Sequence, residues 1–156
     1  MRIETLCRYL GLTKGSFYHH FGNLDGFKQA LLEAWHQQET VRIIARLEPT
    51  ASAQQRRDTL NNLVQQVDNQ LERALRGWAL YDPLVAGWIE RVDHERIDFL
   101  THLAKGQTAA GCSPELVARL AYANFIGSRQ LDHMLSAEDA LNMEQLLQSL
   151  LLRADR

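Results

Sequence analysis

The fold of this chain is decided at residues 3–21, which read IETLCRYLGLTKGSFYHHF. Apolar residues recur at spacings of three and four from Ile3 to Leu10, which predicts a short helix with one apolar face. Gly11 suits the left-handed backbone that commonly ends a helix, and Thr13 is a favoured residue for capping the start of the next one. We therefore predict two short helices, Ile3–Leu10 and Thr13–Phe21, joined by a tight turn.

The remaining sequence favours helices throughout. Its apolar residues keep the spacing of three and four, and the whole chain contains only three prolines. Residues that can cap a helix precede most of the predicted helices, at Asn23, Asp82, Ser113 and Ser136. We expect a polar linker at 49–55, then a helix with its apolar stripe at 60–75 that is interrupted near Gly77, and a helix from Asp82 that ends at about Ala109. The predicted fold class is all-α.

We divide the chain into two predicted domains. Residues 1–46 hold the two short helices and a long connecting helix that starts at Asn23 and runs toward Ile44. Residues 47–156 hold the other helices, which form a larger bundle. A length of 156 residues is enough for two small units of this kind.

Composition and charge exclude several classes of protein. With 17 Lys and Arg against 19 Asp and Glu, the formal charge is -2, which excludes a polybasic tail or a uniformly cationic surface. No apolar run approaches the roughly 18 residues that a bilayer requires, so we expect no membrane partner. Cys7 and Cys112 lie far apart and lack partners at metal-ligand spacing, which indicates a reducing compartment. We expect the protein in the cytoplasm.

Motifs typical of enzymes are absent from the sequence. It contains no G-x-S-x-G elbow, no phosphate-binding glycine loop and no H-E-x-x-H. His94, Asp98 and His102 share one face of a predicted helix, but a solvated stripe among neighbouring charges explains them better than a metal site does. We therefore expect no catalytic activity, no cofactor and no bound metal.

The second short helix has one apolar and one polar face. On a helical wheel Phe17 and Phe21 point toward the interior, and the opposite face carries Gly15, Ser16, His19 and His20. Two short helices around a glycine turn are the layout of a helix-turn-helix, whose second helix enters the major groove of DNA. A helical hairpin with ordinary caps and a solvated histidine pair has the same spacing, so both interpretations stay open at this point.

If this segment binds DNA, its residues have two different roles. Ser16 and His19 offer hydrogen bonds to base edges, and Gly15 lets the backbone approach the DNA closely. The flanking residues contact phosphates, and these are Lys14, Tyr18 and His20. Residues 1–28 contain four Lys and Arg against two Asp and Glu, a net charge of +2 that a dimer would double.

The stretch LCRYLGLTKGSFYHHF, residues 6–21, resembles the DNA-binding signature of the tetracycline-repressor-like (TetR/AcrR) family. The resemblance covers residues 3–35 as a motif, and the rest of the chain agrees with the family only in helical pattern and length. It implies that the DNA contacts are made by Thr13, Lys14, Ser16, Tyr18, His19 and His20. The family usually has a lysine at the position of Leu24, so one phosphate contact is missing here.

The resemblance also implies a helix before Ile3, which would cover the apolar faces of the two short helices. The sequence as given has no residues for that helix. We therefore expect an incomplete three-helix DNA-binding domain, and a native protein that carries about one more helix upstream.

The last two predicted helices are apolar on more than one side. The helix after Ser113 has small residues that permit the close approach of another helix, namely Ala118, Ala121, Ala123 and Gly127. The family resemblance implies that these two helices form a two-fold, four-helix interface in a homodimer. The core of a monomeric bundle would explain the same pattern.

The second predicted domain contains six aromatic residues. The resemblance implies that a small-molecule effector binds among its helices, and the candidate lining residues are Trp78, Tyr81, Trp88, Phe99, Tyr122 and Phe125. Aromatic residues at helical spacing belong to the core more often than to a ligand site, so core packing explains them equally well.

The predicted function is that of a ligand-responsive transcriptional regulator, which binds a palindromic operator in double-stranded DNA as a homodimer. That it is a repressor is implied by the resemblance alone. The alternative is a dimeric helical ligand-binding or interaction module with a truncated, inactive DNA-binding segment.

Overall fold

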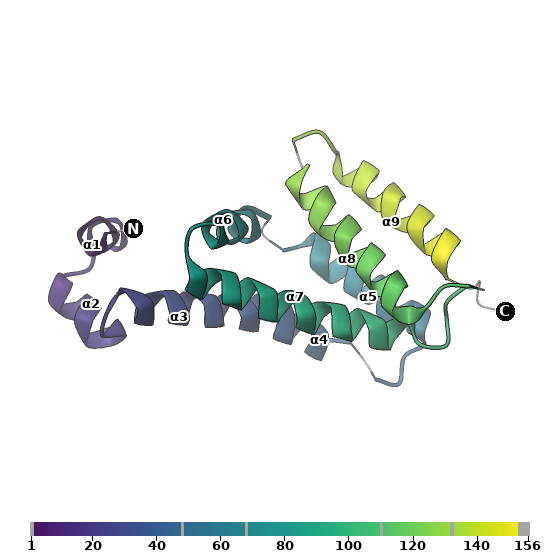
Figure 1. The fold of residues 1–156 in the computed structure, drawn as a ribbon, viewed down its shortest axis with the longest axis horizontal. Helices are drawn as coiled ribbons and strands as arrows, with labels where there is room; N and C mark the ends of the chain where they lie inside the picture. Colours follow the sequence, from purple (N-terminus) through teal and green to yellow (C-terminus); the bar gives the residue numbers. More distant parts are fainter. Residues whose placement is uncertain (1, 48, 68, 110, 132, 153–156) are drawn as a thin grey trace. The chain divides into compact units, whose positions relative to one another are not determined.

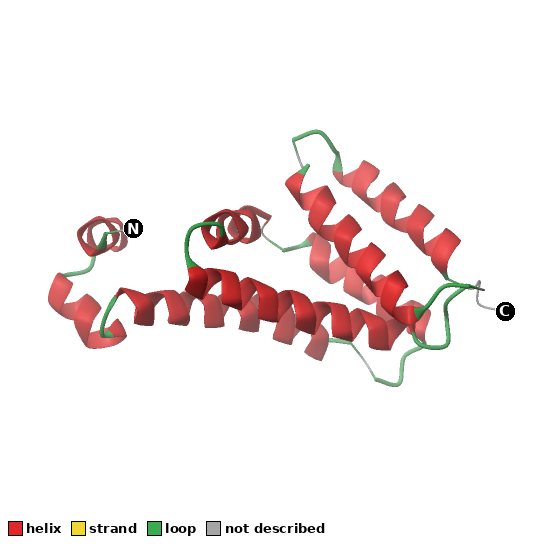
Figure 2. Cartoon of the chain, in the orientation of Figure 1, coloured by secondary structure: helices red, strands yellow, loops and turns green. Residues whose placement is uncertain are grey.

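The chain is helical throughout the part that the structure describes. The computed structural model describes residues 2–47, 49–67, 69–109, 111–131 and 133–152. Within these ranges the regular elements are helices, as Figure 2 shows. One isolated antiparallel bridge joins Thr108 and Leu152. The all-α fold class is therefore confirmed. The chain divides into two compact units, residues 1–42 and 43–156.

The first unit begins with the two short helices, α1 (Ile3–Leu10) and α2 (Lys14–Phe21). Gly11 ends α1 at a φ of 66°, and the Thr13 hydroxyl caps α2 by accepting a hydrogen bond from the Ser16 backbone N–H at 3.1 Å. Both predicted helix ends are confirmed. The turn between the helices spans only residues 11–13.

A long helix follows in the first unit (Figure 1). It begins as α3 (Leu24–His36), passes through a π-helical turn at η1 (Gln37–Val41), and ends as α4 (Arg42–Ala45) at the boundary between the units. Asn23 caps α3 as predicted, with its side chain accepting a hydrogen bond from the Gly26 N–H at 2.8 Å. The π-turn was not predicted, because no proline or glycine marks it.

Three phenylalanine rings join α2 to α3. Phe17 is completely buried, and its ring centroid lies 5.2 Å from that of Phe21 and 5.7 Å from that of Phe27. The rings of Phe21 and Phe27 meet edge to face at 5.2 Å, a favoured arrangement of aromatic side chains. One face of α2 is thus fixed against the unit, and the opposite face is left exposed.

The second unit contains five helices among its described residues. They are α5 (Ala53–Gln65), α6 (Asn69–Ala79), α7 (Pro83–Ala104), α8 (Pro114–Gln130) and α9 (Ala137–Leu151). The central helix is α7, which packs against α5, α6 and α8, while α9 packs against α8 (Figure 1). Fully buried Leu75, Val85 and Val92 form the core where α6 meets α7.

Several predicted helix starts in this unit are confirmed. The side chains of Asp82, Ser113 and Ser136 each accept a hydrogen bond from a backbone N–H in the first turn of the following helix. Ser136 and Asp139 form a reciprocal capping box. These ends depend on a few neighbouring residues, which is why a sequence pattern can locate them.

Three predicted boundaries are wrong. The expected linker at 49–55 ends early, because Ser52 and Gln55 form a capping box that starts α5 at Ala53. The expected break at Gly77 lies between α5 and α6 instead, and Gly77 continues α6, since one glycine costs a helix only about 1 kcal/mol. The helix α7 ends five residues before the expected Ala109, and Gly106 adopts a φ of 77° just beyond it.

Gly26 gives a direct test of the packing between α2 and α3. A Cβ atom at this position would lie 2.0 Å from the backbone oxygen of Phe21, which cannot move independently of the chain. We expect Gly26→Ala to lower the free energy of unfolding by about 1–3 kcal/mol, measured by thermal and urea denaturation with far-UV circular dichroism.

Gly15→Ala is the matched control within the same unit. Its Cβ would meet only the Thr13 Oγ1 at 3.9 Å, and alanine favours a helix over glycine by about 0.5–1 kcal/mol. This variant should be at least as stable as the wild type. Equal stability of the two variants would contradict the packing described above.

Candidate functional site

The residues predicted to contact DNA lie together on α2 and at its cap. Lys14, Gly15, Tyr18, His19 and His20 are exposed, and Ser16 is half-buried. Thr13 is exposed too, but its hydroxyl oxygen already accepts the capping hydrogen bond. The rings of His19 and His20 lie 5.3 Å apart at the end of the helix. We call the exposed side of α2, with these residues, the α2 face.

The α2 face offers hydrogen-bonding groups of several kinds. It has an ammonium group at Lys14, a phenol at Tyr18 that is 49% exposed, and two imidazoles. Imidazole and hydroxyl groups can donate or accept, so they can pair with base edges or phosphate oxygens. Directly behind this face, Phe17 is inaccessible to solvent, so the backbone that carries the polar groups is firmly held.

An ion pair links the start of α2 to the start of α1. The Lys14 Nζ lies 2.6 Å from the Glu4 Oε1, and both side chains are well exposed. This hydrogen bond raises the pKa of Lys14 and lowers the pKa of Glu4. The sequence analysis missed the pair, because ten residues and a turn separate its members.

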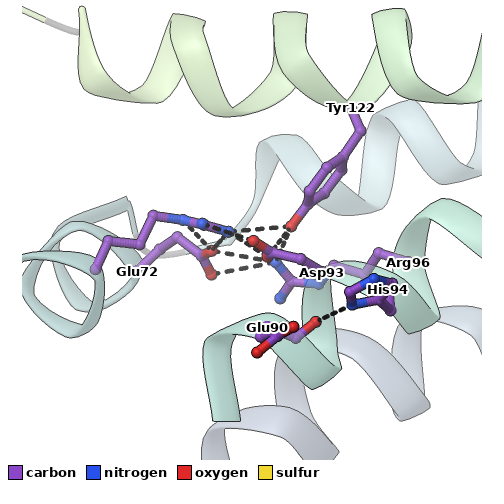
Figure 3. A network of polar contacts seen from close by, with 7 residues as sticks. Glu72, Glu90, Asp93, His94, Arg96 and Tyr122 are labelled. Atoms are coloured by element: carbon purple, nitrogen blue, oxygen red, sulfur yellow. Dashed lines mark hydrogen bonds and ion pairs between the residues drawn. The ribbon is translucent and has the colours of Figure 1, made fainter. Parts of the chain in front are cut away.

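The second unit contains a buried network of charges that was also missed. Four charged side chains and one phenol meet where α6, α7 and α8 pack together, and they are Glu72, Arg76, Asp93, Arg96 and Tyr122. Figure 3 shows Glu72, Asp93, Arg96 and Tyr122 converging from the three helices. The two carboxylates and two guanidinium groups balance in charge.

Arg76 is the centre of this network. Its guanidinium binds both oxygens of Asp93, at 2.6 and 3.0 Å, and also donates to the Glu72 Oε1 at 2.8 and 3.0 Å. Burial by itself lowers the pKa of Arg76, but the hydrogen bond to Asp93 and the surrounding negative charges outweigh it, so the pKa is raised overall. Paired guanidinium and carboxylate planes of this kind fix the relative positions of α6 and α7.

Tyr122 connects α8 to the same network. Its hydroxyl donates to the Asp93 Oδ1 at 2.6 Å and accepts from Arg76 at 3.0 Å. Burial raises the pKa of Tyr122 to about 12, because the loss of water disfavours the phenolate more than the nearby Arg96 stabilises it. Tyr122 therefore stays neutral and serves as a hydrogen-bond donor in the core.

The aromatic residues predicted to line an effector pocket are not brought together as a set. Tyr122 and Phe125 stack at 5.9 Å, with the Arg129 guanidinium over the Phe125 ring. Tyr81 is 87% exposed in the turn before α7. The remaining three, Trp78, Trp88 and Phe99, are half-buried, and Arg91 covers Trp88 at 3.6 Å.

A cavity of about 60 Å³ lies elsewhere in the second unit, among α5, α7, α8 and α9. Its apolar wall includes Leu60, Leu103, Val117 and Leu147, and none of the six predicted aromatic residues lines it. Ordinary ligand pockets measure about 300–1,000 Å³, so in this conformation the cavity holds only a very small molecule. The sequence signal that could have found it is the leucine spacing shared by α7 and α9.

Exposed apolar side chains are concentrated on α8, α9 and the segment between them. They are Leu116, Leu120, Leu131, Met134, Leu141, Met143, Leu146 and Leu150. Leu146 and Leu150, one turn apart on α9, are 60% and 64% exposed. We call these eight residues the apolar surface.

Neither a metal centre nor a membrane-spanning helix is found among the described residues. No group of three or more His, Cys, Asp and Glu side chains there is arranged to hold a metal ion. The His94 Nδ1 atom forms a hydrogen bond with the Glu90 carbonyl oxygen at 2.8 Å (Figure 3). No described helix is both long and apolar enough to cross a bilayer.

No family model, curated protein or solved structure matches this chain. Its function must therefore be argued from the α2 face, the apolar surface, the cavity and the buried network.

Tyr122 leads to a prediction about alkaline stability. The phenol has an ordinary pKa near 10 and a folded pKa of about 12, so the folded state holds its proton more tightly than the unfolded chain does. The stabilisation is complete below pH 10 and is lost as the pH rises toward 12. In urea unfolding at pH 9–11.5, the free energy of unfolding of Tyr122→Phe should fall less steeply with pH than that of the wild type. At pH 7 the variant should be less stable by about 1–3 kcal/mol, because its hydrogen bonds are lost.

Tyr81→Phe is the control for this experiment. It removes a phenol that is 87% exposed, so both the stability and its dependence on pH should match the wild type. If Tyr122→Phe and the wild type lose stability equally over the alkaline range, Tyr122 is not held neutral by the network.

Proposed function

We propose that this chain is a ligand-responsive transcriptional regulator that binds double-stranded DNA as a homodimer through the α2 face. The observation that carries the proposal is a short helix, set after a turn of three residues, whose polar side is exposed while Phe17 behind it is fully buried. A helix with its side chains is about 10–12 Å wide, and the major groove of DNA is about 12 Å wide. In this proposal α1 and α2 are the two helices of a helix-turn-helix.

The charges of the chain support a local rather than a general attraction to DNA. The whole chain carries a formal charge of -2, but residues 1–28 carry +2. Arg2, Arg8 and Lys14 are all exposed in this region. Attraction to phosphates is therefore confined to the surroundings of the α2 face, and base contacts must supply much of the preference for an operator.

The residues of the α2 face are proposed to act in two groups. Ser16 and His19 contact base edges, and Gly15 lets the helix backbone come close to the DNA. Lys14, Tyr18 and His20 contact phosphates together with the exposed hydroxyl of Thr13. This assignment agrees with the resemblance of residues 6–21 to the TetR/AcrR signature.

The apolar surface supports a homodimer as the binding unit. Leucine and methionine side chains exposed on α8 and α9 would leave water if the same two helices of a second copy packed against them. A two-fold dimer repeats the α2 face, and recognition helices about 34–36 Å apart reach successive major grooves of a palindromic operator. Binding by both copies raises the affinity for DNA.

Regulation is proposed to act through the second unit. An effector that prefers a different arrangement of its helices changes the spacing between the two recognition helices, and a coupling of about 1–3 kcal/mol lowers DNA affinity by roughly 5- to 150-fold. The cavity among α5, α7, α8 and α9 is one starting point, which must widen to accept an effector of ordinary size. Release of a repressor from its operator is the expected response.

DNA binding can be tested without knowing the operator. We expect the purified chain to enrich a palindromic sequence from a randomised duplex library. Lys14→Ala should weaken binding to every sequence, whereas His19→Ala should relax the preference at one base position by about 1–3 kcal/mol. Gel shifts on the enriched sequence and on its point variants separate the two effects.

The same measurements can refute this assignment. Equal effects of Lys14→Ala and His19→Ala on all sequences would show that the two groups of residues are wrongly assigned. If a folded, dimeric chain enriches no sequence, the alternative function is favoured, in which the DNA-binding segment of this chain is inactive. The protein would then be a helical interaction module.

The dimer can be tested at the apolar surface. Replacing Leu146 and Leu150 with Glu places two carboxylates in each copy of the proposed interface, where both would lose water without a partner. We expect sedimentation velocity to show a dimer for the wild type and a monomer for this variant. Both side chains are exposed within the chain, so the helical content should not change.

Leu80→Glu is the control for charge. Leu80 is 77% exposed and lies in the turn between α6 and α7, outside the apolar surface. This variant should remain a dimer. A wild-type chain that sediments as a monomer, or a double variant that stays dimeric, would exclude α8 and α9 as the interface.

A further inference from the structure

The ion pair between Glu4 and Lys14 occupies one of the proposed phosphate contacts. The two charged atoms are 2.6 Å apart, a short charge-assisted hydrogen bond between the first turn of α1 and the first turn of α2. Both side chains are more than half exposed, at 58% for Lys14 and 64% for Glu4. The ammonium group is thus accessible to DNA while it is already neutralised by a carboxylate of the same chain.

One ammonium group cannot pair at full strength with both a DNA phosphate and the Glu4 carboxylate. Lys14 has three N–H donors, so geometry alone permits two acceptors. However, a phosphate bound at Lys14 would lie within a few ångströms of the carboxylate, and two like charges at that distance repel each other. When Lys14 turns to the phosphate, Glu4 loses its partner and attracts a cation from solution instead.

We propose that Glu4 competes with the DNA backbone for Lys14 and so sets the affinity of the α2 face below the value that its cations alone would give. The inference rests on the proposed function. It assigns Glu4, a residue outside the α2 face, the role of tuning the strength of DNA binding. It also explains how a chain with a net charge of -2 limits its attraction to DNA of any sequence.

The proposal predicts a defined change in salt dependence. In the wild type the Glu4 carboxylate offsets the charge of Lys14 beside the phosphate, so this contact releases little of the cation held by the DNA. Without the carboxylate, the full release of about 0.9 ion per phosphate contact remains. Glu4→Gln should therefore bind more tightly at low salt and show a steeper loss of affinity as salt increases.

A double-mutant cycle tests the competition directly. The wild type, Glu4→Gln, Lys14→Ala and the double variant are titrated against a fluorescent duplex of mixed sequence, about 30 base pairs long, at about 50–200 mM KCl. We expect Glu4→Gln to bind about two- to fivefold tighter than the wild type, the range that an exposed ion pair permits. In the Lys14→Ala background the same change should have little effect, because no ammonium group is left to release.

Asp25→Asn is the matched control. Asp25 is an exposed carboxylate in the same unit, 66% accessible and paired with Lys28 at 2.8 Å, and its replacement changes the net charge by the same amount. The Lys28 side chain is only 13% exposed, so breaking this pair presents little new positive charge to DNA. Asp25→Asn should raise the affinity for the duplex clearly less than Glu4→Gln does.

The results of these titrations test the role of Glu4 separately from DNA binding itself. The inference is overturned if Glu4→Gln tightens DNA binding equally in the presence and absence of Lys14. It is also overturned if Glu4→Gln tightens binding no more than Asp25→Asn does. Either result shows a general effect of net charge. Glu4→Gln that weakens binding shows that Glu4 orients Lys14 instead, which also overturns it. In both cases DNA binding itself remains. If none of the folded proteins binds DNA, the proposed function and the inference fall together.

Discussion

The largely buried charges of Glu72, Arg76, Asp93 and Arg96 tie three helices of the second unit together. Two carboxylates and two guanidinium groups have lost most of their water, so each must be compensated by a partner on another turn or helix. Removing one member typically costs about 3–5 kcal/mol, because an opposite charge is then left buried and unmatched. The network therefore fixes α6, α7 and α8 in one arrangement, with Tyr122 held neutral between them.

The first unit relies on a different kind of interaction. Phe17, Phe21 and Phe27 hold α2 against α3 through their rings, without buried charges. This apolar contact leaves the opposite side of α2 free to carry ammonium, phenol and imidazole groups. The proposed DNA-binding surface is thus the outward half of a helix whose inward half is fixed. In our proposal, the exposed Glu4 carboxylate on α1 lowers the affinity of this surface for DNA.

In both units, carboxylates of the same unit pair with cationic side chains. The second unit cancels its buried charges within one network, while the first pairs an exposed lysine with Glu4 and keeps only a small positive excess. For the proposed function, this charge balance means that attraction to phosphates is weak and that shape and base contacts must select the operator. The proposed regulator also needs a second copy of the chain, and the apolar surface on α8 and α9 is the proposed site at which that copy packs.

The sequence by itself determined the all-helical fold, most of the capped helix starts and the polar side of α2. Thr13, Asn23 and Ser136 each cap a backbone N–H three residues away, so their effect can be predicted locally. Only the tertiary structure decided which charges are buried and paired. Arg76 and Asp93 are 17 residues apart and Tyr122 is 46 from Arg76, so their meeting depends on how three helices pack. The cavity and the Glu4–Lys14 pair were hidden for the same reason, because a helical pattern defines faces but not their neighbours.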